Sequence, residues 1–515
     1  MIKITITSNA RSYHMTTVRV FAGDFGASGG KCFAGVYENG TFRLNEVHRF
    51  AHESVPFYVA DSTGTVSERA YWDDVLLYQN LVKGLREFRR TVSDKLDGIG
   101  IDTWGADGQF FTADGDAMGK MYAYRDHRLD DMVDKVRTKV GAKKAYALTG
   151  IHFQPFNVSN QLYWFMLNRK NTLKPGCFYL PAPALFYYYL GGARSVDSTF
   201  ASVTQLMDAH TKTWSAEILK KLKIPASVMP PIVEPGSVVG ELHAELATLV
   251  GLNRARLIAV GGHDTASAFA AAPVDNPDEA LIISSGTWSL VGKLIPQANT
   301  SKEAMSHNFS NEGGIGNVRL LKNCMGSWLV QELKRIWQHT DGSEVKWSEM
   351  DRWTREAPSF TAFVDPDDKS FYNPQDMQKA IAEYCQKTGQ PVPVDRGTYL
   401  RVVYESLALK YRYVNELLTK VSGKPNRVVH IVGGGSKNTM LNQYTADAVG
   451  LPVMAGPEEA TAIGNCMVQA MGLGVIKTMR DAIPLIREAF PIREYKPQDL
   501  TRWNDAYKKF KALLK

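Results

Sequence analysis

The chain has few cysteines: five among 515 residues, scattered and without a C-x-x-C pair. This pattern argues against a structural zinc site and favours a reducing cytoplasm. Long apolar runs are also missing, because no stretch approaches the roughly 18 residues that a membrane span requires. The first residues, MIKITITSNARSYHM, lack the apolar centre of a signal peptide. We therefore expect a cytoplasmic protein with no membrane partner.

Blocks of like charge are absent too, although the formal net charge is +7. A nucleic-acid partner is therefore not expected, whereas the mild positive charge suits anionic small molecules. Two common nucleotide signatures are also missing. The chain has no G-x-x-x-x-G-K-[ST] and no strand-like run followed by G-x-G-x-x-G. Their absence disfavours P-loop enzymes and dinucleotide-binding dehydrogenases.

The chain does contain short β-branched runs that alternate with helical patterns, which indicates α/β layers. A Pro/Asn/Asp-rich segment, PVDNPDE, predicts a domain boundary near residue 276. We predict an N-terminal domain at 16–275 and a C-terminal domain at 276–515. Residues 1–15 form an extension that is set apart from the fold. Asn39-Gly40 predicts a tight hairpin, because both positions of a type I′ turn need positive φ.

Three glycine-rich turns follow strand-like runs. The first, GDFGASGGK, brings Asp24 and Lys31 together. Its backbone N–H groups suit phosphate oxygens, Lys31 adds a positive charge, and Asp24 suits a Mg²⁺ ion beside the phosphates. The second, SSGTWS, offers the Thr287 hydroxyl, and the third, VGGGSKN, lies where a helix begins. Any one of them is consistent with an ordinary structural turn, but three favour nucleotide binding.

A further group, GGHDTASA at residues 261–268, places His263 and Asp264 at the end of a strand-like run. Strand ends are the usual position of site residues in α/β folds. Asp264 suits a general base that accepts a hydroxyl proton during phosphoryl transfer. It also suits a helix N-cap without a chemical role, and the two roles are compatible.

From about residue 18 to 472 the chain resembles the FGGY family of carbohydrate kinases, and within it the rhamnulokinase branch. The markers, in order, are GDFGASGGK, VHRF, GIDTWGAD, YRDHR, GIHFQPFN, GGHDTASA, SSGTWSLVG, NEGG, LKNCMGSWLVQ, HIVGGGSKNTMLNQ and GPEEATAIGN. The resemblance implies an α/β fold of two actin-like (ribonuclease H-like) domains around a catalytic cleft. It also implies ATP-dependent phosphorylation, with Mg²⁺, of the O1 hydroxyl of a deoxy-ketose, with L-rhamnulose as the first candidate.

The same resemblance assigns site residues position by position. The proton acceptor falls on Asp264, and Asp24 faces the metal–phosphate complex. The sugar-binding positions are Gly105, His263, Thr265 and Asn323. The ATP-binding positions are Ala27, Ser28, Gly29, Gly30, Lys31, Thr287, Gln331 and Gly434. The implied partners are thus a small ketose and ATP.

Some positions depart from the rhamnulokinase pattern. Lys31 stands in place of an arginine and loses its bidentate fork. Gly108 stands in place of an aromatic residue, so we expect a wider sugar wall, and Ala184 stands in place of an acid. Two alternatives stay open: a kinase of L-fuculose or another ketose, and a non-catalytic actin-like sensor that binds ATP. The retained Asp264 favours catalysis, because a sensor needs no general base.

Overall fold

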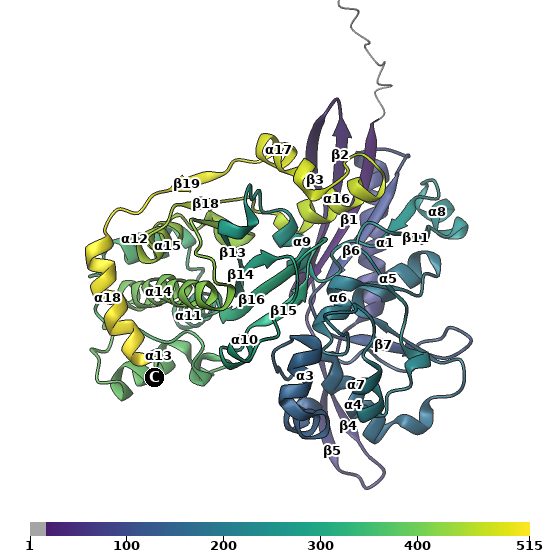
Figure 1. The fold of residues 1–515 in the computed structure, drawn as a ribbon, viewed down its shortest axis with the longest axis horizontal. Helices are drawn as coiled ribbons and strands as arrows, with labels where there is room; N and C mark the ends of the chain where they lie inside the picture. Colours follow the sequence, from purple (N-terminus) through teal and green to yellow (C-terminus); the bar gives the residue numbers. More distant parts are fainter. Residues whose placement is uncertain (1–16, 515) are drawn as a thin grey trace, which may run out of the picture.

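Two mixed sheets, one from each half of the chain, form the framework of the protein (Figure 1). The computed structural model describes residues 17–514, so the predicted extension at 1–15 lies outside the described residues. The order β3-β2-β1-β6-β12 in the first sheet corresponds to β16-β14-β13-β17-β18 in the second. In both, the first two pairings are antiparallel and the next two are parallel. The halves therefore repeat one strand arrangement.

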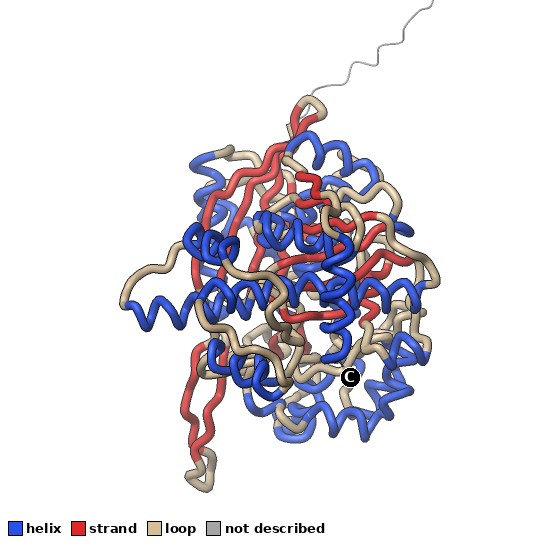
Figure 2. Tube along the Cα trace, turned by 90° about the vertical axis from the view of Figure 1, so that its left-hand side faces the viewer, coloured by secondary structure: helices blue, strands red, loops and turns tan. Residues whose placement is uncertain are grey.

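The first sheet and its neighbours contain the strands of the N-terminal half. They are β1 (Val18–Gly26), β2 (Gly29–Glu38), β3 (Thr41–Ala51), β6 (Gly98–Thr103), β11 (Val238–Glu241) and β12 (Arg256–Ile258), with the pairs β4 (Val55–Ala60) and β5 (Val66–Tyr71), β7 (Gly108–Phe111) and β8 (Phe178–Pro181), and β9 (Val196–Asp197) and β10 (Ile232–Val233). The β4–β5 hairpin projects from the molecule (Figure 2). Every residue of β6 is buried, as expected for a parallel strand covered on both faces.

The second sheet contains the strands of the C-terminal half. They are β13 (Ala280–Ser285), β14 (Trp288–Ile295), β15 (Ser310–Gly313), β16 (Val318–Met325), β17 (Val428–Val432), β18 (Val453–Ala455) and β19 (Arg493–Tyr495). The predicted strand–turn–strand at SSGTWS is confirmed as β13–β14. The predicted Asn39-Gly40 turn is confirmed between β2 and β3, with φ of 53° and 79°.

Helices pack around both sheets (Figure 1). They are α1 (Asp74–Thr91), α2 (Met132–Val136), α3 (Ala142–Thr149), α4 (Val158–Asn168), α5 (Ala182–Gly191), α6 (Ser198–Val203), α7 (Ala216–Leu222), α8 (Ala244–Val250), α9 (Asp264–Ala270), α10 (Lys302–Ser306), α11 (Trp328–Asp341), α12 (Trp347–Glu356), α13 (Met377–Lys387), α14 (Arg396–Ser422), α15 (Thr439–Val449), α16 (Ala460–Gly472), α17 (Met479–Ala489) and α18 (Leu500–Leu513). Between residues 17 and 514, none of them has the length and apolar character needed to cross a membrane.

Two of these helices, α9 and α16, pack against each other where the two halves meet (Figure 1). Gly464 of α16 lies so close to α9 that a Cβ there would stand 1.8 Å from the Ser267 carbonyl oxygen. The same helix packs on the first sheet, where Ile463 and Met467 share a buried cluster with Val20 of β1. A helix from the C-terminal half therefore completes the core of the N-terminal sheet. The boundary near residue 276 stays a prediction.

Candidate active site

The first glycine turn joins β1 to β2 and is formed by Ala27 and Ser28. The strand register makes Asp24 and Lys31 cross-strand neighbours, as the sequence suggested. Packing explains the two glycines that follow. A Cβ on Gly30 would lie 2.2 Å from the Phe50 ring, and one on Gly29 would lie 3.0 Å from the Phe50 carbonyl oxygen. The narrow turn is therefore required by its neighbour strand β3.

Lys31 reaches across to the C-terminal half. Its Nζ donates to both carboxylate oxygens of Glu459, at 2.9 and 2.8 Å. Glu459 directly precedes α16, so this ion pair joins the first glycine turn to that helix. Both side chains remain about a quarter exposed, at 29% and 25%. The pair is accessible to an incoming phosphate group.

Lys31 and Glu459 should have opposite effects on ATP affinity. Lys31→Ala removes the cation and leaves Arg49, 4.0 Å away, as the partner of Glu459, so we expect ATP to bind at least about tenfold more weakly. Glu459→Gln frees Lys31 for the phosphates, so affinity should be equal or higher. Isothermal titration with ATP, with and without Mg²⁺, measures both. Unchanged affinity in Lys31→Ala would mean that the ion pair is purely structural.

Three carboxylates gather beside this turn: Asp24, Asp102 and Asp264. Asp102 is the partner of Asp24 in the parallel β1–β6 register, and Asn465 of α16 donates to its Oδ2 at 2.6 Å. Burial, and then the charge of Asp24, raise the pKa of Asp102 well above its usual value. Burial, and then Asp264, raise the pKa of Asp24 to about 7, while Lys31 opposes the rise. Asp102 is therefore the carboxyl group of the three that most favours the protonated form.

The GGHDTASA segment follows strand β12, which ends at Ile258, and contains the start of helix α9. Asp264 is the first residue of α9, and His263 holds the N-cap position without a side-chain cap. The alternative role of Asp264 as the N-cap is therefore wrong. Asp264 Oδ1 accepts from the Thr265 backbone N–H at 2.6 Å and from its hydroxyl at 3.1 Å. Within residues 17–514 no hydrogen bond reaches Oδ2, which leaves this oxygen for a ligand.

The remaining residues assigned to the sugar lie next to this segment or on β16. A Cβ on Gly105 would lie 2.5 Å from His263 Nε2, so only glycine fits against the imidazole. Asn323 lies on β16, and its Oδ1 is a buried atom without a partner in the described part of the chain. A buried amide oxygen without a donor is costly, so this position suits a ligand hydroxyl.

The residues assigned to ATP in the C-terminal half gather at the β13–β14 turn. Thr287 donates its hydroxyl to Gln331 Oε1 at 3.3 Å. The third glycine turn lies beside it, because a Cβ on Gly435 would stand 2.0 Å from Ser285 Oγ. Gly434 itself faces open space, with no atom within 4 Å of an added Cβ. Helix α15 starts after this turn, at Thr439.

Behind Gly105, the buried Asp107 organises a wall of aromatic residues. Its Oδ2 accepts from the indole N–H groups of Trp72 at 2.7 Å and Trp104 at 2.9 Å. Its Oδ1 accepts from Gln161 at 2.9 Å. Asp107 has φ of 74°, a strained value for a non-glycine residue, which these bonds hold in place. Burial raises its pKa to about 6, although the indole donors oppose this.

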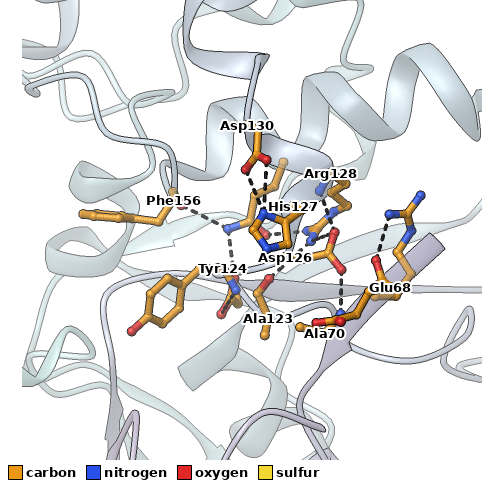
Figure 3. A network of polar contacts seen from close by, with 12 residues as sticks. Glu68, Ala70, Ala123, Tyr124, Asp126, His127, Arg128, Asp130 and Phe156 are labelled. Carbon is orange, nitrogen blue, oxygen red and sulfur yellow. Dashed lines mark hydrogen bonds and ion pairs between the residues drawn. The ribbon is translucent and has the colours of Figure 1, made fainter. Parts of the chain in front are cut away.

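Asp126, His127 and Arg128 of the YRDHR segment belong to a network of polar contacts (Figure 3). Arg128 donates to Gln161 Oε1 at 3.2 Å, and thereby fixes the amide that binds Asp107. Asp126 accepts from the backbone N–H groups of Ala70 at 2.6 Å and Arg128 at 2.8 Å. The YRDHR segment is therefore linked to Asp107, in the loop between β6 and β7, through hydrogen bonds of Gln161.

The expectation that Gly108 widens the sugar pocket is wrong. A Cβ there would lie 2.3 Å from the Tyr179 hydroxyl and 2.5 Å from the Leu180 carbonyl oxygen. The space left by the missing aromatic ring is thus filled by the paired strand β8. Tyr179 is buried, so it packs as part of the core.

Asp107 gives the wild type a specific pH dependence of stability. A folded-state pKa of about 6, above the usual 3.8, means that the native state binds the proton more tightly. This contribution is present at low pH and is lost as pH rises through about 4 to 6. The unfolding free energy of Asp107→Asn relative to wild type should therefore increase by about 1 kcal/mol from pH 5 to 7. Denaturant titrations measure it, with the exposed Asp116→Asn as control. A pH-independent difference would contradict the assignment.

Several polar residues of this site were not foreseen from the sequence. Asp197 presses on the GGHD turn, since a Cβ on Gly262 would lie 2.1 Å from its Oδ2. Glu312 of the NEGG segment and Arg319 of β16 form a buried ion pair, 3.2 Å long, next to His263. His152 of GIHFQPFN is buried near Glu312, and neither ring nitrogen has a partner among residues 17–514. The markers NEGG and GIHFQPFN contain Glu312 and His152, whereas Asp197 and Arg319 lie outside every marker.

The described residues contain no group of three or more His, Cys, Asp or Glu side chains arranged to hold a metal ion. Asp24 nevertheless suits a Mg²⁺ ion that binds together with the phosphates of ATP. Mg²⁺ is usually held by one or two carboxylates together with waters and substrate phosphates. Asp24 supplies one carboxylate beside the first glycine turn, with Asp102 next to it in the β1–β6 register.

Comparison with known proteins agrees with this geometry. Residues 59–270 match the model of the FGGY family of carbohydrate kinases, N-terminal domain, and residues 281–473 match its C-terminal domain. The chain is 38% identical over 495 residues to a rhamnulokinase of Bacteroides thetaiotaomicron, which covers 95% of this chain and 98% of the relative. It is 35% identical to a rhamnulokinase of Pectobacterium carotovorum, over 97% of each chain.

Solved structures show the same fold. A xylulose kinase of Rhodospirillum rubrum matches with a TM-score of 0.75 at 18% identity, over 97% of this chain and 98% of that one. A gluconate kinase of Lactobacillus acidophilus matches with a TM-score of 0.74 at 16% identity, over 97% of each chain. The predicted architecture of two actin-like α/β domains is therefore confirmed.

Proposed function

Since this chain belongs to the FGGY family of carbohydrate kinases, we propose that it transfers the γ-phosphoryl group of ATP to the O1 hydroxyl of a deoxy-ketose, L-rhamnulose first. The observation that carries the proposal is Asp264, whose Oδ1 is fixed by Thr265 while Oδ2 is free to accept a proton. Relatives named rhamnulokinase at 35–38% identity over nearly the full length support the choice of sugar. The five unpaired, buried cysteines suit the reducing cytoplasm.

The proposed reaction proceeds by in-line transfer. The sugar O1–H gives its proton to Asp264 Oδ2 as the oxygen forms a bond to the γ-phosphorus, and the bond between that phosphorus and the bridging oxygen of ADP breaks. The backbone of Ala27–Gly30 and the charge of Lys31 bind phosphate oxygens, and Thr287, Gln331 and Gly434 hold the nucleotide. Bound Mg²⁺, held by Asp24, would neutralise charge on the phosphates. His263 and Asn323 orient the sugar through hydrogen bonds.

The choice of sugar rests on hydrogen bonds, which discriminate between hydroxyl stereoisomers. A buried Asn323 oxygen and the His263 imidazole would be left unpaired by a sugar without the matching hydroxyls. L-fuculose differs from L-rhamnulose only in hydroxyl stereochemistry. L-fuculose would be accommodated by extra space at Gly108, but Tyr179 fills that space. L-rhamnulose therefore ranks ahead of L-fuculose, and both rank ahead of D-xylulose and L-ribulose.

A coupled ADP-release assay over L-rhamnulose, L-fuculose, D-xylulose, L-ribulose and glycerol tests the proposal. We expect L-rhamnulose to give the highest kcat/KM, at least about tenfold above L-fuculose, from one lost hydrogen bond to buried polar groups. ADP formation independent of every sugar would instead favour an ATP-binding sensor. Highest activity with glycerol or D-xylulose would overturn the choice of sugar and leave the kinase assignment standing.

A further inference from the structure

His263 lies between two sets of charged groups, one at each ring nitrogen. Its Nε2 is the atom nearest to Gly105, and it lies 3.4 Å from Asp264 Oδ1. Its Nδ1 faces away from Asp264, toward Arg319 and Glu312 of the C-terminal half. The neutral imidazole carries one proton, and whichever nitrogen holds it becomes a donor while the other becomes an acceptor. The groups at Nδ1 therefore decide what Nε2 offers to the sugar.

Arg319 is the group that is directed at Nδ1. Its Nη2 lies 3.3 Å from Nδ1 with an N–H pointing at the nitrogen. An arginine only donates, so a hydrogen bond from it requires an unprotonated Nδ1. Glu312 Oε2 lies 3.4 Å from the same nitrogen but forms no hydrogen bond there within the described chain. The geometry thus selects the tautomer with its proton on Nε2.

Glu312 serves as the anchor of this arginine. The Arg319 side chain is fully buried, its Nε donates to the Gly313 carbonyl oxygen at 2.8 Å, and its Nη2 lies 3.2 Å from Glu312. Burial raises the pKa of Glu312, but the charge of Arg319 is the largest of the causes that lower it, and the pKa is about 2. Glu312 is therefore charged throughout the working pH range and keeps the guanidinium in place.

We propose that the Glu312–Arg319 pair is a positioning device that fixes His263 in its Nε2–H tautomer, so that the imidazole donates to a sugar hydroxyl. This rests on the proposed function for its role in sugar binding. Neither Arg319 nor Glu312 acts on the reacting atoms; they act through His263. The device also links the halves, because His263 precedes α9 while Glu312 and Arg319 lie on β15 and β16. The orientation of the sugar site thereby depends on the second sheet.

The tautomer is measured directly by long-range ¹H–¹⁵N spectra of the full protein labelled with ¹⁵N-histidine. The chain has 11 histidines, and the cross-peaks missing in His263→Asn identify the residue. We expect a protonated Nε2 and an unprotonated Nδ1 in wild type near pH 8. A protonated Nδ1 in wild type would overturn the proposal. This measurement needs no sugar, so its failure is distinct from failure of the proposed function.

Kinetics test the consequence with a matched set of variants. Arg319→Met combined with Glu312→Met removes both groups at Nδ1 without leaving a buried charge unpaired or adding a new donor, so the Nε2–H tautomer should be lost. We expect kcat/KM for the ketose to fall about tenfold to a hundredfold, with the KM for ATP unchanged. Arg319→Lys keeps a charged donor and should restore part of the loss. Arg401→Met combined with Glu405→Met removes another ion pair, 2.8 Å long, away from His263, and controls for stability.

The outcomes divide cleanly. Loss of the tautomer together with loss of sugar kcat/KM in the Arg319 double variant, but not in the Arg401 double variant, supports the proposal. Equal effects of the two double variants on sugar kcat/KM would overturn it, because the effect would then be one of stability. A retained Nε2–H tautomer in the Arg319 double variant would also overturn it.

Discussion

Asp264→Asn should lower kcat by about 10²–10⁴-fold, the usual effect of removing a general base. The amide is nearly isosteric and keeps an oxygen that can accept the Thr265 hydrogen bonds, so the start of α9 should not change. It cannot take the proton of the sugar hydroxyl. ATP affinity should stay within about twofold, because the substitution changes the proton acceptor and not the phosphate-binding groups. Turnover from ADP release and affinity from titration calorimetry measure the two quantities.

The neighbouring Thr265 offers the control for this experiment. Thr265→Ala removes the hydroxyl that binds Asp264 Oδ1 at 3.1 Å but keeps the backbone N–H bond at 2.6 Å. Its effect should be about tenfold, the lower limit for one hydrogen bond to a charged group, because the backbone bond remains. If Asp264→Asn retains more than half of the wild-type turnover, another group is the base and the proposed mechanism is wrong.

Gly464→Ala should lower both stability and turnover, although Gly464 is not itself a residue of the site. A Cβ at this position would stand 1.8 Å from the backbone oxygen of Ser267 on α9. Backbone cannot move aside as a side-chain tip does, so the helices must separate, at a cost of about 3 kcal/mol or more. Asp264 begins α9, and a displacement of about 1 Å would cost on the order of 10²-fold in turnover. Thermal unfolding and steady-state kinetics measure both effects.

The sign of this prediction opposes simple helix propensity. Glycine to alanine inside a helix normally adds about 1 kcal/mol of stability. A loss in α16 therefore isolates the close contact between the helices. Gly240→Ala on β11 is the matched control, because its added Cβ would meet other atoms only at ordinary distances of 3.8–4.0 Å. Equal stability of wild type and Gly464→Ala would mean that α9 and α16 can separate without cost.

Local patterns predicted the features that depend on local chemistry. The Asp24–Lys31 pairing follows from a short turn between two strands, and the Asn39-Gly40 turn follows from its need for positive φ. The strand–turn–strand at Thr287 could be recognised in the same way. Such features are set by neighbours within about ten residues, so composition and spacing are sufficient to find them.

Contacts between distant segments could not be found in this way. Lys31 and Glu459 are 428 residues apart, and Asp102 and Asn465 are 363 residues apart. In the sequence, Arg319 is a single charged residue in a strand-like run. Only the fold brings it to His263, which lies 56 residues earlier. The error at Gly108 has the same origin. A missing side chain leaves space only when no other element fills it, and Tyr179 does so from 71 residues away.

The position of α16 on the first sheet has a consequence for biosynthesis. All strands of that sheet have left the ribosome soon after residue 258, yet Val20 and Phe33 are covered by Ile463 and Met467. At roughly 5–20 residues per second, the ribosome needs about 10–40 s to make the intervening segment. Throughout that interval the part of the sheet face under α16 lacks its native cover, although α9 is already present. The core of the first sheet is therefore completed only when about the last tenth of the polypeptide is being translated.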